Sequence, residues 1–176
     1  LMLFILEGEY SISCNEFRNR TFKTGEVAFM PKGSVVKCKT TVESRSLTCI
    51  FDAINNVCNK LNLHSYWPIC RNIDYDFRPI EIRPQLYTFL DTLKYYLHEG
   101  INCEHFHEIK QQELFLILRW FYPKETLAEL FYPIIGNSID FKALVLENYL
   151  KVDSVTQLAE LSRMGRSNFD SVFKQE

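Results

Sequence analysis

The side chains best suited to holding a metal ion gather between positions 98 and 107 of this 176-residue chain. They are His98, Cys103, His105 and His107, and zinc takes its protein ligands from His and Cys. On a helix, however, neighbours on one face are three or four positions apart, so His105 and His107 would point away from each other. We therefore predict no metal site here. We interpret these residues as the polar end of one helix and the polar start of the next.

Two carboxylate pairs, Glu7 with Glu9 and Asp74 with Asp76, have the spacing that puts both side chains on one face of a strand. Paired carboxylates can carry out acid–base chemistry. Glu7 and Glu9 flank a glycine, however, and this pattern predicts a solvated turn. No Ser/His/Asp set, phosphate-binding loop or dinucleotide fingerprint can be read in the sequence. We therefore expect a protein that is not an enzyme and that uses no cofactor.

Polar residues near the end of the chain suit contact with nucleic acid. Arg can read guanine and Asn can read adenine through paired hydrogen bonds, whereas Lys suits a phosphate contact. We predict these roles for Arg166, Ser167, Asn168, Ser171 and Lys174. The alternative is a solvated helix face that contacts no partner.

Two short helices are needed to position these residues, one on each side of a break at Arg163-Met164-Gly165. Ser154 suits the N-cap of the first helix, and Ser167 that of the second. Two short helices around a glycine-containing turn are typical of a helix-turn-helix, whose second helix lies in the DNA major groove. The predicted apolar faces are Val155, Leu158, Ala159 and Leu161 in the first helix, and Phe169, Val172 and Phe173 in the second.

This segment resembles the first helix-turn-helix of bacterial transcriptional regulators of the AraC type (AraC/XylS). That family has Leu-Ala, then a Ser that opens the recognition helix, then a large apolar residue, then Phe-Lys. The chain supplies Leu158-Ala159, Ser167, Phe169 and Phe173-Lys174 in this order. The resemblance implies that a linker helix and a second helix-turn-helix follow, so we expect a truncated DNA-binding domain. The alternative is a pair of packed helices at the end of an enzyme domain.

The first third of the chain predicts β-strands. Tyr10, Ile12 and Cys14 alternate with serines, and short apolar runs are separated by the turn signals Gly25-Glu26 and Pro31-Lys32-Gly33. Several short strands at regular spacing favour a sandwich or a barrel.

Three motifs in this region resemble the cupin-type jelly roll that forms the sensor domain of the same regulators. They are Leu6-Glu7-Gly8, Gly25-Glu26 and Pro31-x-Gly33. Cupin enzymes usually follow the last motif with a metal-binding His, at the position of Val36 in this chain. An apolar side chain cannot ligate a metal, which disfavours a metal-dependent enzyme. A cupin enzyme with a helical appendage, dependent on a metal or not, is the alternative function.

The period becomes helical from Pro84 onward. We predict helices from Pro84 to Gly100, over about 104–121 and over 124–131, followed by a break at 132–137. A further helix, capped by Ser138 or Asp140, is expected to turn Phe141, Leu144, Val145 and Tyr149 inward. In AraC-type regulators, paired helices of this kind commonly form the homodimer contact. The alternative is that they only pack back on the β-rich part.

Composition limits the remaining classes. Hydrophobic residues make up 47% of the chain, which suffices for a real core, and the net charge of −2 argues against a protein that coats nucleic acid. Acidic residues also match the basic ones after position 138, so we expect this chain alone to bind DNA weakly or not at all. Six cysteines without a Cys-x-x-Cys pair predict buried, reduced thiols in a cytoplasmic protein. The sequence shows neither a signal peptide nor a stretch of ~20 apolar residues. We therefore expect no membrane partner.

The sequence thus predicts an α+β chain in three parts. Residues 1–80 form a cupin-like sensor domain that lacks upstream residues, 81–137 a helical dimerisation segment, and 138–176 the first part of an all-α helix-turn-helix domain. The predicted function is a DNA-binding transcriptional regulator. Its partners are DNA, bound by the intact protein only, a second copy of the chain and a small-molecule effector of unknown identity. A third hypothesis is a dimerisation or binding module whose helix-turn-helix no longer reads DNA.

Overall fold

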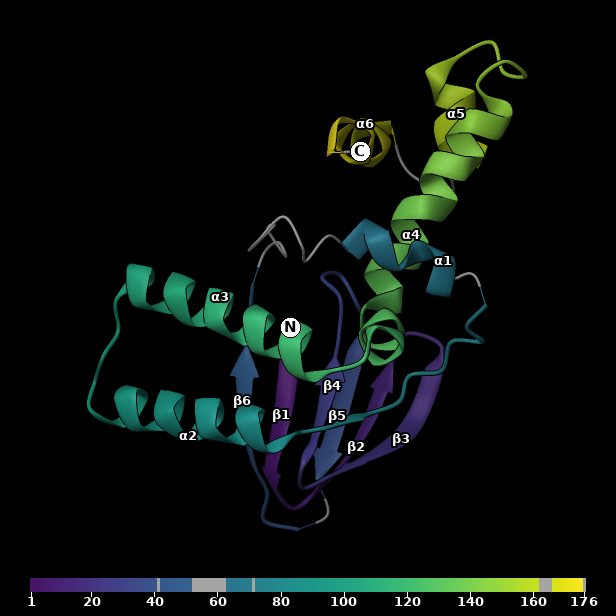
Figure 1. Cartoon of the computed structure of the whole chain (residues 1–176). Helices are drawn as coiled ribbons and strands as arrows, with labels where there is room; N and C mark the ends of the chain where they lie inside the picture. The colour runs from purple at the N-terminus through teal and green to yellow at the C-terminus, as the bar shows by residue number, and fades with distance from the viewer. Residues whose placement is uncertain (41, 52–62, 71, 162–165, 176) are drawn as a thin grey trace. The chain divides into compact units, whose positions relative to one another are not determined.

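The computed structural model describes residues 1–40, 42–51, 63–70, 72–161 and 166–175 (Figure 1). The fold is α+β, as predicted. The chain divides into two compact units, Leu1–Pro133 and Ile134–Glu176. Among the described residues, no helix is both long and apolar enough to cross a lipid bilayer.

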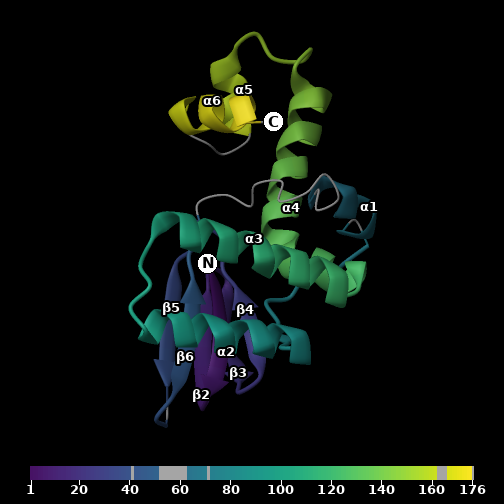
Figure 2. The ribbon, with the colours of Figure 1, turned by 60° about the vertical axis from the view of Figure 1, so that its left-hand side comes forward.

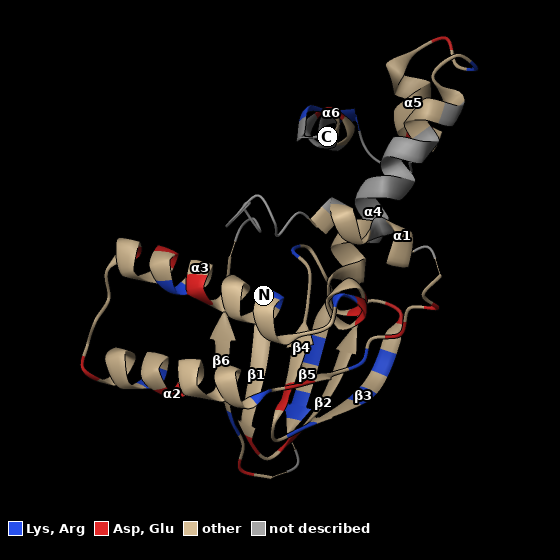
Figure 3. Ribbon diagram, viewed as in Figure 1, with Lys and Arg blue, Asp and Glu red and all other residues tan. Residues whose placement is uncertain are grey.

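The first unit is built on two antiparallel sheets. The first sheet has the order β6-β1-β4-β7 and the second the order β3-β2-β5. The described strands do not close into a barrel, so the cupin-type jelly roll stays a prediction. The second sheet carries the Lys and Arg residues of β3 and β5 (Figure 3). The strands are β1 (Met2–Glu7), β2 (Glu9–Cys14), β3 (Phe17–Lys23), β4 (Glu26–Phe29), β5 (Val36–Thr40), β6 (Arg45–Cys49) and β7 (Ile80–Glu81).

The core between the sheets follows from side-chain alternation. Tyr10, Ile12 and Cys14 of β2 point inward, as their alternation with serines predicts, and pack with Leu3 and Ile5 of β1. Met2 and Phe4, on the other face of β1, are fully buried as well. Helices α2 (Pro84–His98) and α3 (Glu104–Phe121) lie over that face (Figure 2). Because β1 is covered on both faces, its sequence is a continuous apolar run and does not alternate.

Two glycines of the cupin-like motifs occupy turns that only glycine fits well. Gly8, between β1 and β2, has φ +84°, and a Cβ there would lie 2.2 Å from Ser44 Oγ. Gly25, between β3 and β4, has φ +87°. Its N–H donates to the Ile5 carbonyl at 2.9 Å and its carbonyl accepts from the Ile82 N–H at 2.7 Å. These turns therefore set the connections between the strands.

Helix α2 (Pro84–His98) and helix α3 (Glu104–Phe121) pair along one side of the first unit (Figures 1 and 2). Their buried residues are Leu86, Phe89, Leu90 and Leu93 in α2, and Leu114, Phe115 and Leu118 in α3. Lys110 of α3 lies between the helices, with Nζ 5.2 Å from the centre of the Tyr96 ring. Leu97 of α2 and Ile109 of α3 are exposed although both are apolar. Ile109 is exposed because the face of α3 that turns inward carries Lys110, Leu114 and Leu118, and Ile109 lies outside this face.

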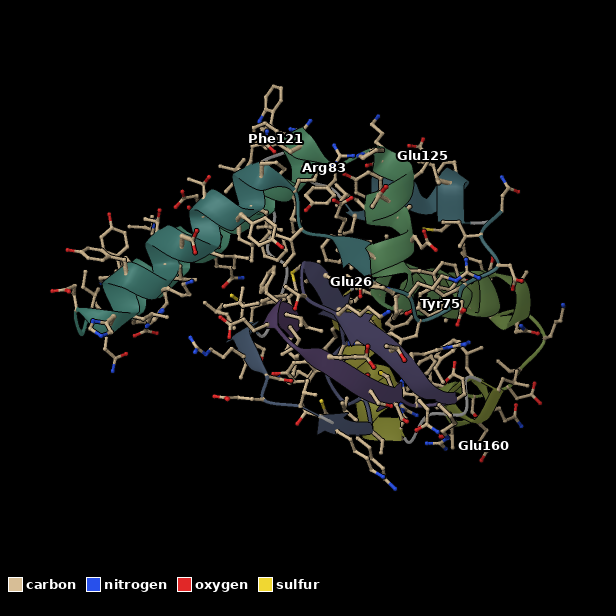
Figure 4. All side chains as sticks on the ribbon, turned by 90° about the horizontal axis from the view of Figure 1, so that it is seen from below. Glu26, Tyr75, Arg83, Phe121, Glu125 and Glu160 are labelled. Atoms are coloured by element: carbon tan, nitrogen blue, oxygen red, sulfur yellow. The ribbon has the colours of Figure 1, made fainter. Side chains whose placement is uncertain are left out.

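The end of α3 is tied to the start of α2 by one hydroxyl group. Tyr122 donates its O–H to the Glu81 carbonyl at 2.8 Å and accepts the Arg83 N–H at 2.9 Å. The Arg83 guanidinium also lies over the Tyr122 ring, 5.1 Å from its centre, and donates to the Phe121 carbonyl (Figure 4). Burial raises the pKa of Tyr122, so the hydroxyl keeps its proton near neutral pH. This arrangement fixes β7 and both helices to one another.

Helix α4 (Lys124–Asn148) begins at the predicted residue but continues through Pro133. The helix therefore does not end at the predicted break over 132–137, and the new helix capped by Ser138 or Asp140 is wrong. The boundary between the two compact units nevertheless falls within this segment, after Pro133. Pro133 has no N–H and costs one helical hydrogen bond. Phe131 and Ile135, on either side of it, are buried, and their burial offsets this cost. The remaining helices are η1 (Leu63–Tyr66), α1 (Trp67–Cys70), α5 (Val155–Leu161) and α6 (Arg166–Gln175).

Candidate nucleic-acid interface

Helix α5 begins with the predicted cap. Ser154 Oγ accepts the Gln157 N–H at 3.3 Å, which confirms Ser154 as the N-cap. Gln157 Oε1 in turn accepts the Asp153 N–H at 2.9 Å. This reciprocal pair resembles a capping box, except that Gln157 bonds to the N–H of Asp153 and not to that of the N-cap residue Ser154. A helix of seven residues needs such a start, because short helices are marginal by themselves.

The two short helices are held together by a small apolar cluster. Leu158 and Ala159 of α5 and Phe169 of α6 are buried in it, and Val145 and Val152 pack against its side. The alanine leaves room for the aromatic ring where the helices approach. These three buried residues confirm part of the predicted apolar faces. Val155 and Leu161, predicted for the same face, are about half exposed.

Phe173 differs from its neighbour one turn earlier. The Phe169 and Phe173 rings stack with their centres 5.9 Å apart, yet Phe169 is 1% exposed and Phe173 is 54% exposed. The prediction that both belong to the core is therefore wrong for Phe173. The side chain of Val172, predicted for the same face, lies outside the described residues.

An apolar groove of about 660 Å³ opens between the end of α4 and helices α5 and α6. Phe169 and Phe173 line it together with Tyr149, Leu146 and Val155. Tyr149 is more than half exposed, which contradicts its predicted inward position. Val145 packs inward as predicted, and the side chains of Phe141 and Leu144 lie outside the described part of the chain.

Arg166, the predicted base-reading residue, has partners within the unit. Its Nε lies 3.0 Å from both carboxylate oxygens of Asp170, and its Nη1 donates to Thr156 Oγ1 at 3.2 Å. Arg166 thus joins the first turn of α6 to the first turn of α5. Sequence reasoning missed Asp170 and Thr156. The spacing of four between Arg166 and Asp170 was the available signal, because oppositely charged residues at this spacing pair on a helix.

The other predicted contact residues are placed only in part. Lys174 is exposed in the last turn of α6. The side chains of Ser167, Asn168 and Ser171 lie outside the described residues, as does the whole of the predicted break at 163–165. Helix α6 begins at Arg166, so Ser167 is its second residue rather than the predicted N-cap.

The histidine and cysteine cluster does not converge. His98 and His105 are exposed. The Nδ1 atom of His98 lies 3.9 Å from Glu99 Oε1, and that of His105 lies 3.5 Å from Glu108 Oε2. Within the described ranges, no three His, Cys, Asp or Glu side chains gather in a way that could hold a metal ion.

The cysteines that the structure describes are free thiols. Burial raises the pKa of Cys49 to about 11, so this thiol stays protonated. Contrary to the prediction of buried thiols, Cys38 and Cys103 are exposed, whereas Cys14 and Cys70 are buried. Cys58 lies outside the described residues.

Comparison of the chain with protein-family models, with curated proteins and with solved structures found no match.

Proposed function

We propose that this chain is the sensor and dimerisation region, with the first helix-turn-helix, of an AraC-type transcriptional regulator. In this proposal the intact protein binds DNA in a sequence-specific manner. The observation that carries it is the α5–α6 pair. Its small Ala159 and large Phe169 are buried between the helices, Ser154 caps the first helix, and Arg166 and Lys174 are exposed on the second.

The β-sandwich is the sensor in this proposal, with the cupin-like jelly roll as its fold. The turns at Gly8 and Gly25 support this assignment, since their positive φ values account for glycine at both motif positions. An effector would act by favouring one arrangement of the DNA-binding units over another.

Contact between Arg166 and a guanine requires the release of Asp170. The carboxylate of Asp170 holds the guanidinium along the helix and also repels DNA phosphates. We expect Asp170→Asn to raise the affinity for unrelated DNA. The ratio of the affinity for the operator to the affinity for unrelated DNA should therefore fall. Binding titrations with both duplexes measure this difference.

Dimerisation in the proposal uses the outward face of α3. Ile109 is 62% exposed and Trp120 is 73% exposed, and Leu116 lies between them at a spacing that puts all three on one helix face. Exposed apolar stripes of this kind mark protein interfaces. We expect Trp120→Glu to shift the protein from dimer to monomer in analytical ultracentrifugation. Val35→Glu, at an exposed residue of the β4–β5 connection, is the control that leaves the dimer intact.

The central test is a mobility-shift titration of the intact protein with the DNA upstream of its own gene. We expect Arg166→Ala and Asn168→Ala each to weaken operator binding about tenfold to 100-fold, since one base contact supplies roughly 1–3 kcal/mol. Lys174→Ala should weaken binding to all sequences and lower the salt slope by about one. The matched control is Arg45→Ala, which removes an exposed arginine of β6.

Two results would count against the proposal. Absence of sequence-specific binding at low salt would reject a DNA-binding regulator. Operator binding that is unchanged by Arg166→Ala and Asn168→Ala would favour a binding module whose helix-turn-helix does not read DNA.

A further inference from the structure

Strand β5 is paired along one edge only. Its ladder partner is β2, and within the described residues no other strand or main-chain hydrogen bond reaches positions 36–40. All five residues of β5 are exposed. An exposed strand edge is a template for a further strand.

Nothing in the described part of the chain covers the inner face of β5, although this face continues the core side of β2. Val36, Cys38 and Thr40 pair with Cys14, Ile12 and Tyr10 of β2, all of which are buried in the core between the sheets. Directly paired residues of an antiparallel ladder lie on the same face, so the three β5 residues face the inside of the sandwich. On the facing sheet, Ser46 and Thr48 of β6 pair with Ile5 and Leu3 in the same way and are also exposed. Figure 2 shows β5 and β6 at the same end of the sandwich.

The opposite end of the sandwich indicates what kind of segment covers such an edge. There, residues 73–77 alternate apolar and acidic side chains, in the order Ile-Asp-Tyr-Asp-Phe. Tyr75 meets Phe17 edge-on at 5.5 Å and Phe77 lies 5.0 Å from Phe22, so the aromatic rings close the core beside β3. Asp76 Oδ1 meets Arg20 Nη2 of β3 at 2.5 Å. Arg20 pairs with Ile12 of β2, so this ion pair lies on the inner-face side of β3.

The charges of β5 favour a partner that presents acidic side chains on the outer face of the sheet. Lys37 and Lys39 pair with Ser13 and Ser11 of β2, so both lysines lie on the outer face of the sheet. Neither has an ion pair within the described residues, and Figure 3 shows basic residues along the ribbon of β5. A second copy of β5 would bring lysines opposite lysines, and like charges in facing positions destabilise a ladder. Edge lysines thus prevent self-pairing and leave the edge open to an acidic strand.

We propose that the β5 edge binds an extended segment of a partner protein in which apolar and acidic residues alternate. The segment adds one antiparallel or parallel strand to the β3-β2-β5 sheet. Its apolar side chains cover Val36 and Cys38 on the inner face, and its carboxylates meet Lys37 and Lys39 on the outer face. Main-chain hydrogen bonds supply affinity in this mode, and the alternating side chains supply specificity.

The test uses the full chain and three synthetic peptides of about eight residues, long enough for one strand. In the first peptide Val and Tyr alternate with Asp, in the second Lys replaces Asp, and the third has the composition of the first with the acids grouped at one end. We expect the first to bind roughly tenfold more tightly than the others in fluorescence anisotropy, because cross-strand charge pairs and register both contribute. Hydrogen exchange at the amides of residues 36–40 should slow when it binds.

The charge-reversal variant provides the decisive control. Lys37→Glu together with Lys39→Glu should lose the preference for the Asp peptide and gain one for the Lys peptide. Equal binding of the three peptides to the native chain would overturn the proposal, as would protection of amides outside β5. Equal displacement of the Asp peptide by poly-glutamate or DNA would replace it with a general site for polyanions. These measurements on the native chain decide the question even if the double variant does not fold.

Discussion

The two ends of the β-sandwich differ although they are built on the same central strand. Both β3 and β5 pair with β2, and each has residues opposite the buried positions Tyr10 and Ile12. At the β3 end, Phe22 and Phe77 are buried, because residues 73–77 cross the edge and bring aromatic rings to the core. At the β5 end, Val36 and Cys38 have the same register relation to the core and are exposed.

This difference shows that register decides which way a side chain points, whereas burial depends on what lies beyond the strand. A Val on an inward-facing position stabilises the fold only if another segment removes it from water. The β3 end has such a segment in the same chain, and the described residues supply none to the β5 end.

Phe77→Ala should produce the largest loss. Phe77 is 3% exposed and contacts the rings of Phe22 and Phe17, so its removal leaves a cavity in the core. We expect the free energy of unfolding to fall by about 3–5 kcal/mol, measured by urea denaturation. A loss below about 1 kcal/mol would mean that residues 73–77 do not close this end of the sandwich.

Tyr122→Phe should have an intermediate effect. The change removes the hydroxyl that bonds to the Glu81 carbonyl of β7 and to the Arg83 N–H, and leaves both main-chain groups without this partner. We expect a loss of about 1–3 kcal/mol in the same urea experiment. Tyr95→Phe is the matched control, because the Tyr95 ring is exposed on α2. Equal effects of the two changes would contradict a role of Tyr122 in fastening β7.

Lowering the pH should reduce the stability that Asp76 contributes at the β3 end of the sandwich, whereas the β5 end should be unaffected. The hydrogen bond from Arg78 and the nearby Arg20 guanidinium hold the pKa of Asp76 below its ordinary value. A carboxyl whose pKa is lower in the folded state stabilises the fold fully above its unfolded pKa, about 3.9, and loses this contribution as the pH falls through the folded value. Melting temperatures between about pH 2 and 5 should therefore fall less steeply in Asp76→Asn than in the native chain. Lys37→Ala should leave the native slope unchanged.

Val36→Ala should have the smallest effect. Val36 is 37% exposed on the uncovered face of β5, and the methyl groups that are lost are partly in water already. We expect a change within about 0.5 kcal/mol in urea denaturation. A loss as large as that of Phe77→Ala would show that the β5 end is closed in solution and would remove the contrast between the two ends.

Several elements could be predicted because their cause is local. The alternation in Tyr10, Ile12 and Cys14 places these residues inward whatever covers them, and the Ser154 hydroxyl caps α5 through a contact with a residue three positions away. Pro133 shows the opposite case. A local rule predicts a break there, but burial of Phe131 and Ile135 keeps the helix continuous.

The candidate interface was predictable in outline only. The apolar spacing in 155–173 indicates two short helices and correctly assigns Leu158, Ala159 and Phe169 to their contact. It could not separate Phe169 from Phe173, since both lie on the same side of α6 and only the neighbouring elements determine which one is covered. The hydrogen bond from Arg166 to Thr156 could not be predicted from this spacing either, because it joins two different helices.

The order of residues alone thus determined the α+β composition, the inward side of β2 and the start of α5, since each depends on interactions over a few positions. It also marked Gly8 and Gly25 as turn positions, whereas the contacts of these turns with Ser44, Ile5 and Ile82 come from distant parts of the chain. Tertiary structure decided which apolar side chains are covered. It buried Phe77 and left Val36 exposed, and it turned Ile109 and Trp120 of α3 outward. The physical reason is that removal of a side chain from water requires a second segment, and the location of that segment depends on contacts between parts of the chain that are distant in sequence.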